Sequence, residues 1–189
     1  FEMTVGLAFQ YFADENVDIA IIEVGMGGRL DATNIILPEL SVITNIGLDH
    51  TKFLGGTLTE IASEKAGIIK PQTPVVVGEK HSETEDVFRQ VTKQNHSEIF
   101  FAEDAQFKNY DCDLKGFYQI KNQQTVLQAL EILKQKHWNI SDESIKKGLS
   151  QVMKNTGLKG RWQILSENPL CIADTAHNME GMSIVAEQL

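Results

Sequence analysis

The sequence predicts an α/β fold, with a mostly parallel β-sheet flanked by helices and the start of a second, smaller α/β domain at the C-terminal end. Short apolar segments without alternation, typical of strands buried on both faces, alternate with longer segments of helical period. A polar segment at residues 155–159 precedes two further apolar segments and a last helical one. The 189 residues, 42% of them hydrophobic, suffice to bury one domain or slightly more.

The strands are predicted from short apolar and β-branched segments. The first, residues 18–24, has no alternation, so both its faces are expected to be covered and Glu23 near its end to be a buried carboxylate. Residues 107–119 are polar and aromatic without a clear period, and a small hairpin is expected there. The other predicted strands are residues 40–45, 74–78, 98–101, 162–165 and 170–173.

The helices are predicted from apolar periodicity and from the residues at their ends. Thr57 and Glu60 have the spacing of a capping box, and Gly67 suits the end of the same helix. Ser82 and Glu85 repeat the capping-box spacing. The predicted helices are residues 1–12, 57–66, 82–94, 122–136 with Val126, Leu127, Leu130 and Leu133 facing the core, 141–154 with Ser141 as its N-cap, and 178 onward.

Composition excludes several classes of function. The net charge of −9 disfavours nucleic acid and anionic membranes as partners. Cys112 and Cys171 form neither a disulfide framework nor a metal-binding spacing, which fits a reducing, cytoplasmic setting. No run of about 18 apolar residues is present, so no membrane span is expected. No signal peptide is recognisable either.

Chemically active side chains follow three successive elements of the predicted fold. Glu23 ends the first strand, His50 follows the second, and Lys65 lies late in the helix 57–66. The carboxyl ends of parallel strands are where open α/β sheets bind their ligands. A carboxylate, an imidazole and a lysine at such ends indicate a site for metal and phosphate chemistry.

Each of these side chains also has a simpler interpretation. Glu23 could cap the loop that follows it or pair with Arg29 instead of holding a cation. His50 could be an ordinary surface histidine, although Asp49 beside it could also orient it as a metal ligand. Lys65 could be a solvated lysine near a helix C-terminus.

A glycine cluster follows Glu23. Its members, Gly25, Gly27 and Gly28, do not have the spacing of a dinucleotide-binding loop. They are therefore interpreted as positions where the backbone closely approaches another part of the molecule. An ion pair between Arg29 and Asp31 is expected to fix this loop.

The motifs together carry a resemblance to a known family. The segments are "FEMT" (1–4), "EVGMGGRLDATN" (23–34), "ITNIGLDH" (43–50), "LGGTLTEIASEKAGIIK" (54–70), "GRW" (160–162) and "DTAHN" (174–178). They resemble the folylpolyglutamate synthase/dihydrofolate synthase family, a branch of the Mur ligase superfamily, and follow its order over nearly the whole chain. "GGRLDATN" and "EKAGIIK" are specific to the folate branch.

The resemblance implies a domain organisation. Residues 1–158 correspond to part of the central ATP-binding domain of a Mur ligase, and residues 159–189 to the beginning of a Rossmann-like glutamate-ligase domain. The chain starts at Phe1 and has no Gly-x-x-x-x-Gly-Lys-Ser/Thr phosphate loop, which the family carries upstream of this region. It is therefore expected to be a piece of a longer protein.

The resemblance also implies roles for residues near the first strands. Glu23 and His50 are expected to be catalytic residues that bind Mg²⁺. Lys65 is expected to be catalytic in a carbamylated form, as an anionic carboxylate made from the amine and CO₂. Because carbamylation needs a neutral amine, partial burial of Lys65 would favour it. Local positive charge for anionic substrates is expected from these basic residues: Arg29, Lys65, Lys70 and Arg161.

Further roles fall on residues after position 118. Gln119 and Asn122 are expected to bind the adenine of ATP, although Asn122 could be only a helix N-cap. Arg161 is expected to reach the ATP phosphates; the alternative is a surface arginine on a strand edge. Asp174 is expected at the ribose or phosphates and His177 at the ligation centre. The alternative is a polar turn in which Asp174 holds backbone amides, and "DTAHNM" departs from the family's "DGAHNP".

The implied function is that of an ATP-dependent amide ligase with ATP and Mg²⁺ as cofactors. It would add L-glutamate to dihydropteroate or to a folate through an acyl phosphate, and act as a monomer. Three alternatives remain open. They are a Mur-type ligase for peptidoglycan precursors, a Glu/His/Lys metallohydrolase that needs no ATP, and a catalytically inert fragment of the folate enzyme.

Overall fold

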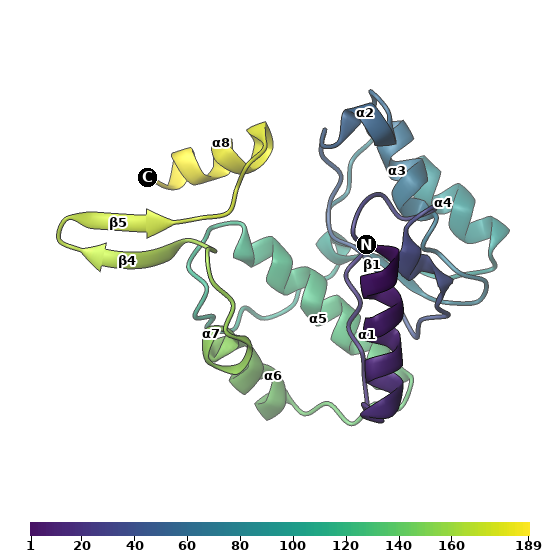
Figure 1. Ribbon diagram of the computed structural model, residues 1–189, viewed down its shortest axis with the longest axis horizontal. Coiled ribbons are helices and arrows are strands. Elements are labelled where there is room, and N and C mark those ends of the chain that lie inside the picture. The colour runs from purple at the N-terminus through teal and green to yellow at the C-terminus, as the bar shows by residue number, and fades with distance from the viewer. The chain divides into compact units, whose positions relative to one another are not determined.

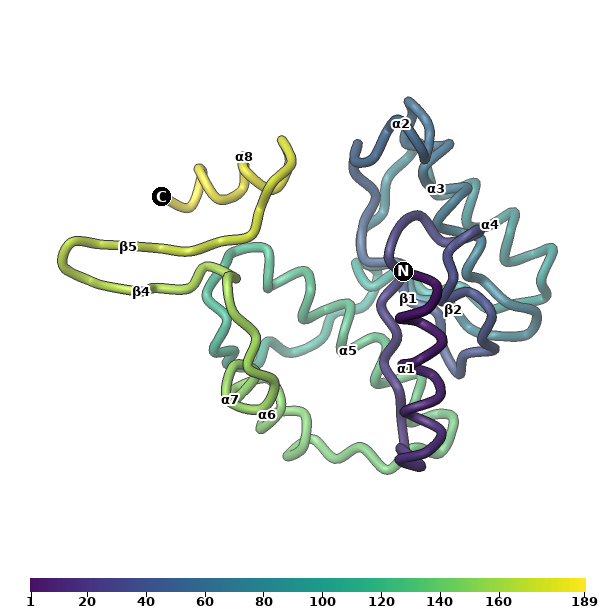
Figure 2. Tube along the Cα trace, viewed as in Figure 1, coloured from purple at the N-terminus to yellow at the C-terminus, as the bar shows by residue number.

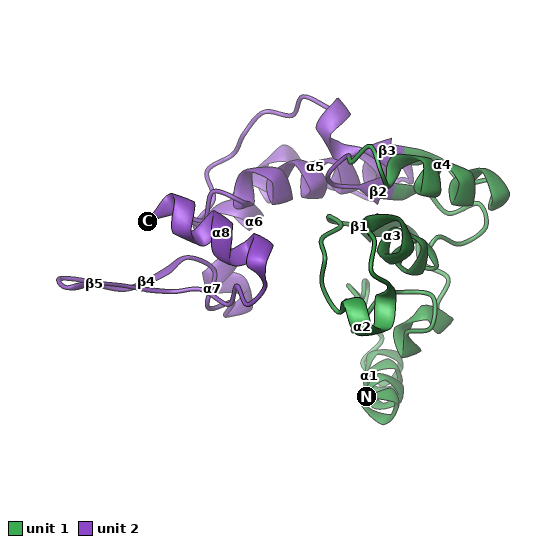
Figure 3. Ribbon diagram, turned by 90° about the horizontal axis from the view of Figure 1, so that it is seen from above, with its two compact units in different colours: residues 1–75, 81–99 green, residues 76–80, 100–189 purple.

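The computed structural model describes residues 1–189, which form two compact units (Figure 3). Unit 1 comprises residues 1–75 and 81–99, and unit 2 comprises residues 76–80 and 100–189. No helix is long and apolar enough to cross a membrane. In chain order (Figure 1), the elements are α1 (Glu2–Asp14), η1 (Ala32–Ile35), β1 (Ser41–Ile43), α2 (Thr51–Leu54), α3 (Leu58–Ala66), β2 (Val75–Val77), α4 (Glu85–Gln94), β3 (Ile99–Phe101), η2 (Ala102–Asp104), α5 (Gln119–Gln135), α6 (Asp142–Ser150), α7 (Val152–Thr156), β4 (Gln163–Glu167), β5 (Leu170–Ala173) and α8 (Met179–Gln188).

The main sheet consists of three short parallel strands in the order β1-β2-β3. The central strand β2 is buried on both faces, with its three valines 0% exposed. A strand whose two faces are both covered needs no polar alternation. The α/β class with a parallel sheet and flanking helices is therefore confirmed.

The core of unit 1 lies between α3 and α4, which pack against each other. Ile61, Ala62 and Ala66 of α3 and Phe88 of α4 are fully buried. The predicted capping box at the start of α3 is confirmed. Thr57 Oγ1 accepts from the Glu60 N–H, and the Glu60 carboxylate accepts from the Thr57 N–H.

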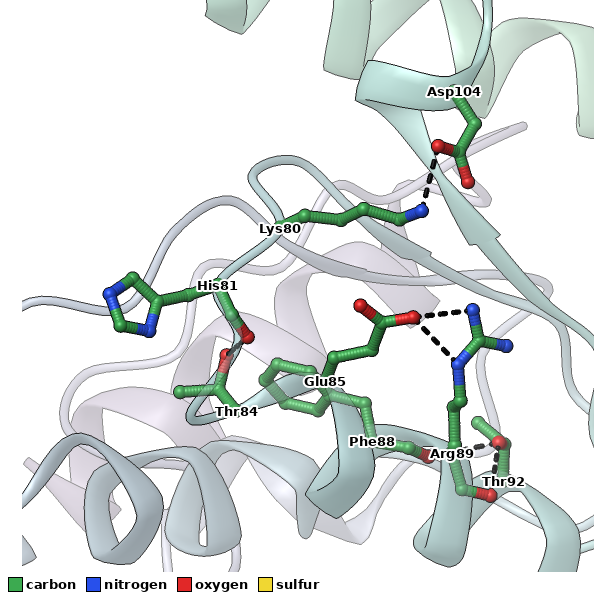
Figure 4. Close-up of polar contacts among 8 residues, drawn as sticks. All are labelled: Lys80, His81, Thr84, Glu85, Phe88, Arg89, Thr92 and Asp104. Atoms are coloured by element: carbon green, nitrogen blue, oxygen red, sulfur yellow. Dashed lines mark hydrogen bonds and ion pairs between the residues drawn. The ribbon is translucent and has the colours of Figure 1, made fainter.

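The start of α4 differs from the prediction. The helix begins at Glu85 with Thr84 as its N-cap, and Figure 4 shows both residues. Ser82 is therefore not the N-cap of α4. The Glu85 carboxylate instead accepts from the Arg89 guanidinium one turn later, at 2.6 and 2.8 Å. A glutamate in the first turn and an arginine four residues on are a favourable pair. The Glu85 carboxylate is therefore paired within the helix and takes no part in a capping box.

Residues 18–24 do not form the predicted strand. No other segment pairs with them, and the side chain of Ile21 is 92% exposed and that of Ile19 is 53% exposed. A strand exists only when its backbone groups pair with a neighbour, and β1 pairs on one side with β2 alone. Glu23 is consequently exposed rather than buried.

In unit 2, β4 and β5 are the two arms of an antiparallel hairpin, visible as a long loop in the chain trace (Figure 2). Gln163 pairs with Ala173 and Glu167 with Leu170, and a register shift lies between Ile164 and Ser166. Helix α8 follows, capped by Asn178, whose Oδ1 accepts from the Gly181 N–H at 2.8 Å. The predicted strands and helix of this region are confirmed.

Residues 107–118 form no hairpin. Their backbone groups are bound by side-chain amides of α5 rather than by another strand. The Gln123 side chain, 7% exposed, accepts from the Tyr110 N–H at 2.7 Å and donates to the Tyr110 carbonyl at 2.9 Å. The amide of Gln124 likewise accepts from the Phe107 N–H. Side-chain amides thus replace the strand partner that a hairpin would supply.

The predicted helix 141–154 is two helices, α6 and α7, which meet at Gln151. Ser141 caps α6 as predicted, accepting from the Ser144 N–H. The Asp113 carboxylate caps α7 from a distant part of the chain, accepting from the N–H groups of Val152 and Met153 at 3.1 and 2.9 Å. This distant cap gives α7 its own N-terminus.

Candidate functional site

The glycine loop after Glu23 packs tightly on α3. A Cβ atom at Gly28 would lie 2.9 Å from the Glu64 carbonyl oxygen and 3.0 Å from that of Lys65. A Cβ at Gly67 would overlap the backbone of Arg29 and lie 2.8 Å from its nitrogen. Cβ atoms at Gly25 and Gly27 would lie 2.5 Å from the Phe1 ring and 2.7 Å from a methyl group of Leu54. The interpretation of these glycines as close-approach positions is therefore correct, and Gly28 is the one that approaches the end of α3.

Arg29 is the main polar link in this contact. Its N–H donates to the Glu64 carbonyl at 2.9 Å, and its guanidinium pairs with the Glu64 carboxylate at 3.0 Å. The predicted Arg29–Asp31 ion pair is therefore wrong. Asp31 instead caps η1, where it accepts from the Thr33 N–H and, across the loop, from the Met26 N–H. The guanidinium is paired with the Glu64 carboxylate of α3, so it is not the partner of Glu23.

A second pair of bonds fixes the other end of the loop. Asn34 Nδ2 donates to the Gly67 carbonyl at 3.0 Å, and Lys70 Nζ donates to the Asn34 carbonyl at 2.7 Å. Lys70 thus stabilises the loop rather than facing solvent. The two segments specific to the folate branch, 27–34 and 64–70, are in direct contact.

Lys65 and His50 lie in one neighbourhood that Asp49 connects. Burial lowers the pKa of Lys65, and the negative charge of Asp49 partly offsets this effect. Asp49 Oδ1 accepts from the His50 N–H at 2.7 Å and lies 4.0 Å from His50 Nε2. His50 itself has a left-handed backbone (φ 49, ψ 34), and its side chain is half exposed. Asp49 therefore binds the main chain of His50, and its charge raises the pKa of Lys65 against the effect of burial.

Glu23 is not brought into that neighbourhood by any protein contact. Its carboxylate is exposed and makes no hydrogen bond or ion pair. No cluster of three or more His, Cys, Asp or Glu side chains forms a metal cage. Mg²⁺ is usually held by one or two carboxylates together with phosphates and water, so a free carboxylate fits that mode of binding and a closed protein site does not.

The first turn of α5 carries the two predicted adenine ligands. Gln119 is its first residue, and Asn122 lies one turn further, exposed, with Nδ2 donating to Gln119 Oε1 at 3.0 Å. The N-cap of α5 is Tyr118, so the alternative that Asn122 is the N-cap is wrong. The two amides are neighbours that present a donor and an acceptor together.

Asp174 lies at the end of β5 and gathers three donors. Its carboxylate accepts from the Trp162 N–H at 2.7 Å, the Ala176 N–H at 2.8 Å and the Tyr118 hydroxyl at 2.7 Å. Burial alone would raise the pKa of Asp174, but these bonds and the charge of Arg161 lower it. Arg161 precedes Trp162, whose side chain is 8% exposed.

His177 lies in the turn before α8. Its Nδ1 is 3.0 Å from the Thr175 carbonyl oxygen, and its side chain is exposed. The loop is therefore a polar turn in which Asp174 binds backbone amides, as the simpler interpretation predicted. It also leaves the His177 ring accessible to a ligand.

Two residues of these sites escaped the sequence analysis. Glu64 holds Arg29 across 35 residues of chain, and Tyr118 holds Asp174 across 56. For Glu64, the only signal was its place beside Lys65 in a family motif. For Tyr118, it was an aromatic residue directly before Gln119.

Comparison with known proteins identifies the family to which the chain is similar. Residues 2–146 match the family model of the Mur ligase middle domain. The chain is 34% identical over 213 residues to the dihydrofolate synthase/folylpolyglutamate synthase of Bacillus subtilis (strain 168), covering 100% of this chain and 49% of the relative. The solved folylpolyglutamate synthase (FPGS) of Thermotoga maritima superposes with a TM-score of 0.82 at 33% identity, covering 99% of this chain and 46% of that one. A solved FPGS–AMPPCP–folate complex superposes with a TM-score of 0.88 at 30% identity, covering 98% of this chain and 51% of that one.

The chain thus spans about half the length of the relatives it matches. The match runs through both units, and the contact between the glycine loop and α3 joins the two most specific sequence segments. The chain therefore belongs to the folylpolyglutamate synthase/dihydrofolate synthase family of Mur ligases.

Proposed function

We propose that the full-length protein is an ATP-dependent ligase that joins L-glutamate to dihydropteroate or to a folate. The observation that supports this most is the packing of segment 27–34 on segment 64–70, because both carry folate-branch motifs and the second carries Lys65. The relatives bear the names of such synthases, and one solved relative holds AMPPCP and folate. We expect the protein to be cytoplasmic and monomeric.

In the proposed reaction, the substrate carboxylate attacks the γ-phosphorus of ATP, forming an acyl phosphate and ADP. The amino group of L-glutamate then attacks the acyl carbon, phosphate leaves, and the nitrogen loses a proton to give the amide. This chain need not supply a nucleophile, because both attacking atoms belong to substrates. Its side chains bind, orient and neutralise charge.

We assign the nucleotide to four residues of unit 2. The neighbouring amides of Gln119 and Asn122 can pair with the adenine edge through one donor and one acceptor. Asp174, ionised because its pKa is lowered, can accept from ribose hydroxyls, while Arg161 can bind phosphate oxygens. The exposed ring of His177 can hold or move a proton near the ligation centre. We also propose that the domain boundary falls between residues 158 and 159.

We assign Mg²⁺ to Glu23 and His50, where it would neutralise the transferring phosphoryl group. Glu23 is suited to this because its carboxylate is exposed and unpaired. Lys65 is suited to carbamylation because burial favours its neutral amine, which can add to CO₂ and lose a proton. The resulting carbamate near Asp49 would place two anionic groups together and so favour a cation beside His50.

The test is phosphate release by the full-length protein with ATP, Mg²⁺ and L-glutamate. Release should require dihydropteroate or a folate. Release with a muramoyl substrate instead would indicate a peptidoglycan ligase, and metal-dependent hydrolysis without ATP would indicate a metallohydrolase. The 189-residue chain alone should be inactive, as the fragment interpretation expects.

Glu23→Gln in the full-length protein tests the role of the carboxylate. It removes a charge opposite the cation and should cost several kcal/mol of transition-state stabilisation. We therefore expect kcat/KM to fall about a hundredfold or more. Glu15→Gln is the matched control, since Glu15 is also exposed in unit 1 and should have no effect. Turnover by Glu23→Gln close to wild type would exclude the assigned role.

A further inference from the structure

The Asp174 carboxylate is held from three directions within unit 2. One oxygen, Oδ2, accepts from both the Tyr118 hydroxyl and the Trp162 N–H, each at 2.7 Å. The other, Oδ1, accepts from the Ala176 N–H at 2.8 Å. Two of these donors, Trp162 and Ala176, flank the β4–β5 hairpin within residues 162–176. Only Tyr118 comes from outside it, from the N-cap of α5.

The Tyr118–Asp174 bond has the features of a strong hydrogen bond. Burial and the bond to Asp174 raise the pKa of the Tyr118 hydroxyl, so it remains a donor at neutral pH. The acceptor is an ionised carboxylate, and a bond between a neutral donor and a charged acceptor is stronger than a neutral one. Tyr118 is half-buried, which limits competition from water.

A second contact joins the same two parts of unit 2. The Gln188 side chain at the end of α8 accepts from the Phe117 N–H at 2.7 Å and donates to the Lys115 carbonyl at 2.9 Å. The charge of Glu180 on α8 also attracts Lys121 of α5. The entry to α5 is thus tied to residues 174–188 on both sides of Tyr118.

We propose that Tyr118 is a positioning residue: by binding Asp174, it fixes the distance between Gln119 and Asn122 on α5 and Asp174 beside Arg161. This inference rests on the proposed function. One nucleotide must reach the amides with its base and the Asp174 region with its ribose and phosphates. A bond that sets this spacing before ATP arrives lowers the cost of ordering the site when the nucleotide binds.

The experiment uses the full-length protein and AMPPCP as the probe, with binding measured by calorimetry and turnover measured separately. Tyr118→Phe removes the hydroxyl and keeps the ring. It should raise the Kd for AMPPCP and the KM for ATP about tenfold, and change kcat at saturating ATP by less than about threefold. A residue needed only for folding would lower the active fraction and leave the KM unchanged.

The matched control is Tyr110→Phe. Tyr110 is also a half-buried tyrosine of unit 2, but only its backbone is hydrogen bonded, so its hydroxyl should be dispensable. A double-mutant cycle provides the second test. If Tyr118 acts through Asp174, Tyr118→Phe should have no further effect on the Kd in the Asp174→Ala background, which has no side-chain acceptor.

The possible results separate the two proposals. If wild type does not bind AMPPCP, the proposed function fails and the inference fails with it. If wild type binds and Tyr118→Phe binds equally well, the inference alone is overturned. It is also overturned if the full tenfold effect persists in the Asp174→Ala background, because Tyr118 would then act by another route.

Discussion

Gly67 is the position where one methyl group tests how the glycine loop packs on α3. Its backbone is an ordinary right-handed helical one (φ −62, ψ −11), so alanine would not be strained there. A methyl group would, however, overlap the Cα and Cβ atoms of Arg29. Gly67→Ala therefore changes only the packing, and any loss of stability measures the close approach.

The size of the effect follows from what must move. Overpacking a close contact costs about 1–3 kcal/mol. Displacing the loop also weakens two hydrogen bonds, from the Arg29 N–H to the Glu64 carbonyl and from Asn34 to the Gly67 carbonyl, each worth about 0.5–1.5 kcal/mol. We expect Gly67→Ala to lower the free energy of unfolding by about 2–6 kcal/mol.

Urea unfolding followed by far-UV circular dichroism measures this change, and hydrogen exchange at the Arg29 amide should report lost protection. Gly6→Ala is the control. Gly6 lies inside α1 in the same unit, and a Cβ there meets nothing within 4 Å, so alanine should stabilise by about 0.5–1 kcal/mol. If Gly67→Ala were as stable as wild type, the described contact would be wrong.

Three further outcomes are expected. Gln123→Met leaves the half-buried Tyr110 N–H and carbonyl unpaired and should cost about 2–4 kcal/mol, with faster exchange of the Tyr110 amide, whereas Gln135→Met at the exposed end of α5 should change little. Because burial lowers the pKa of Lys65, the unfolded chain binds more protons between that lowered pKa and about 10.4. The free energy of unfolding should therefore rise with pH across this window, and Lys65→Met should remove that rise in urea titrations at several alkaline pH values. Asp113→Ala removes the cap of α7 and should cost about 0.5–2 kcal/mol in the same assay, and an unchanged midpoint would contradict the capping role.

Features set by neighbouring residues could be predicted from the sequence. The caps at Thr57 and Ser141 were correct, because a cap depends on residues three or four positions apart. The strand β2 was recognised because a run of valines between Pro74 and Gly78 allows few other structures. The positions of the three strands β1, β2 and β3 along the chain were predicted from such local patterns.

Features that depend on distant residues could not be predicted in this way. Periodicity placed Val126 in the core, yet its side chain is 42% exposed, while Gln123 and Gln128 are buried. Gln123 faces inward where its amide binds the backbone of Tyr110, a contact that no pattern within α5 reveals. Gly67 is the C-cap of α3 as predicted, but its close approach to Arg29 is not local and could not be predicted.

The candidate site likewise has features set by local motifs and features set by distant residues. Its residue types and their places at element ends were visible, since they lie in short motifs. Their mutual contacts were not, because Arg29–Glu64 and Tyr118–Asp174 span 35 and 56 residues. Glu23 illustrates the limit most clearly. Its expected burial required a strand partner for residues 18–24, and none of the described segments provides one.

That unpaired segment also has a consequence for the 189-residue chain at high concentration. Residues 19–24, Ile-Ala-Ile-Ile-Glu-Val, combine high β-propensity with one charge and no proline, the composition of segments that self-associate as stacked strands. Their free N–H and C=O groups can template a second copy, despite the solubilising net charge of −9. A lysine at position 21 would sacrifice almost no packing, since the Ile21 side chain is 92% exposed, and would act as a gatekeeper against aggregation. In this 189-residue chain, these six residues therefore act against the solubilising effect of the net charge.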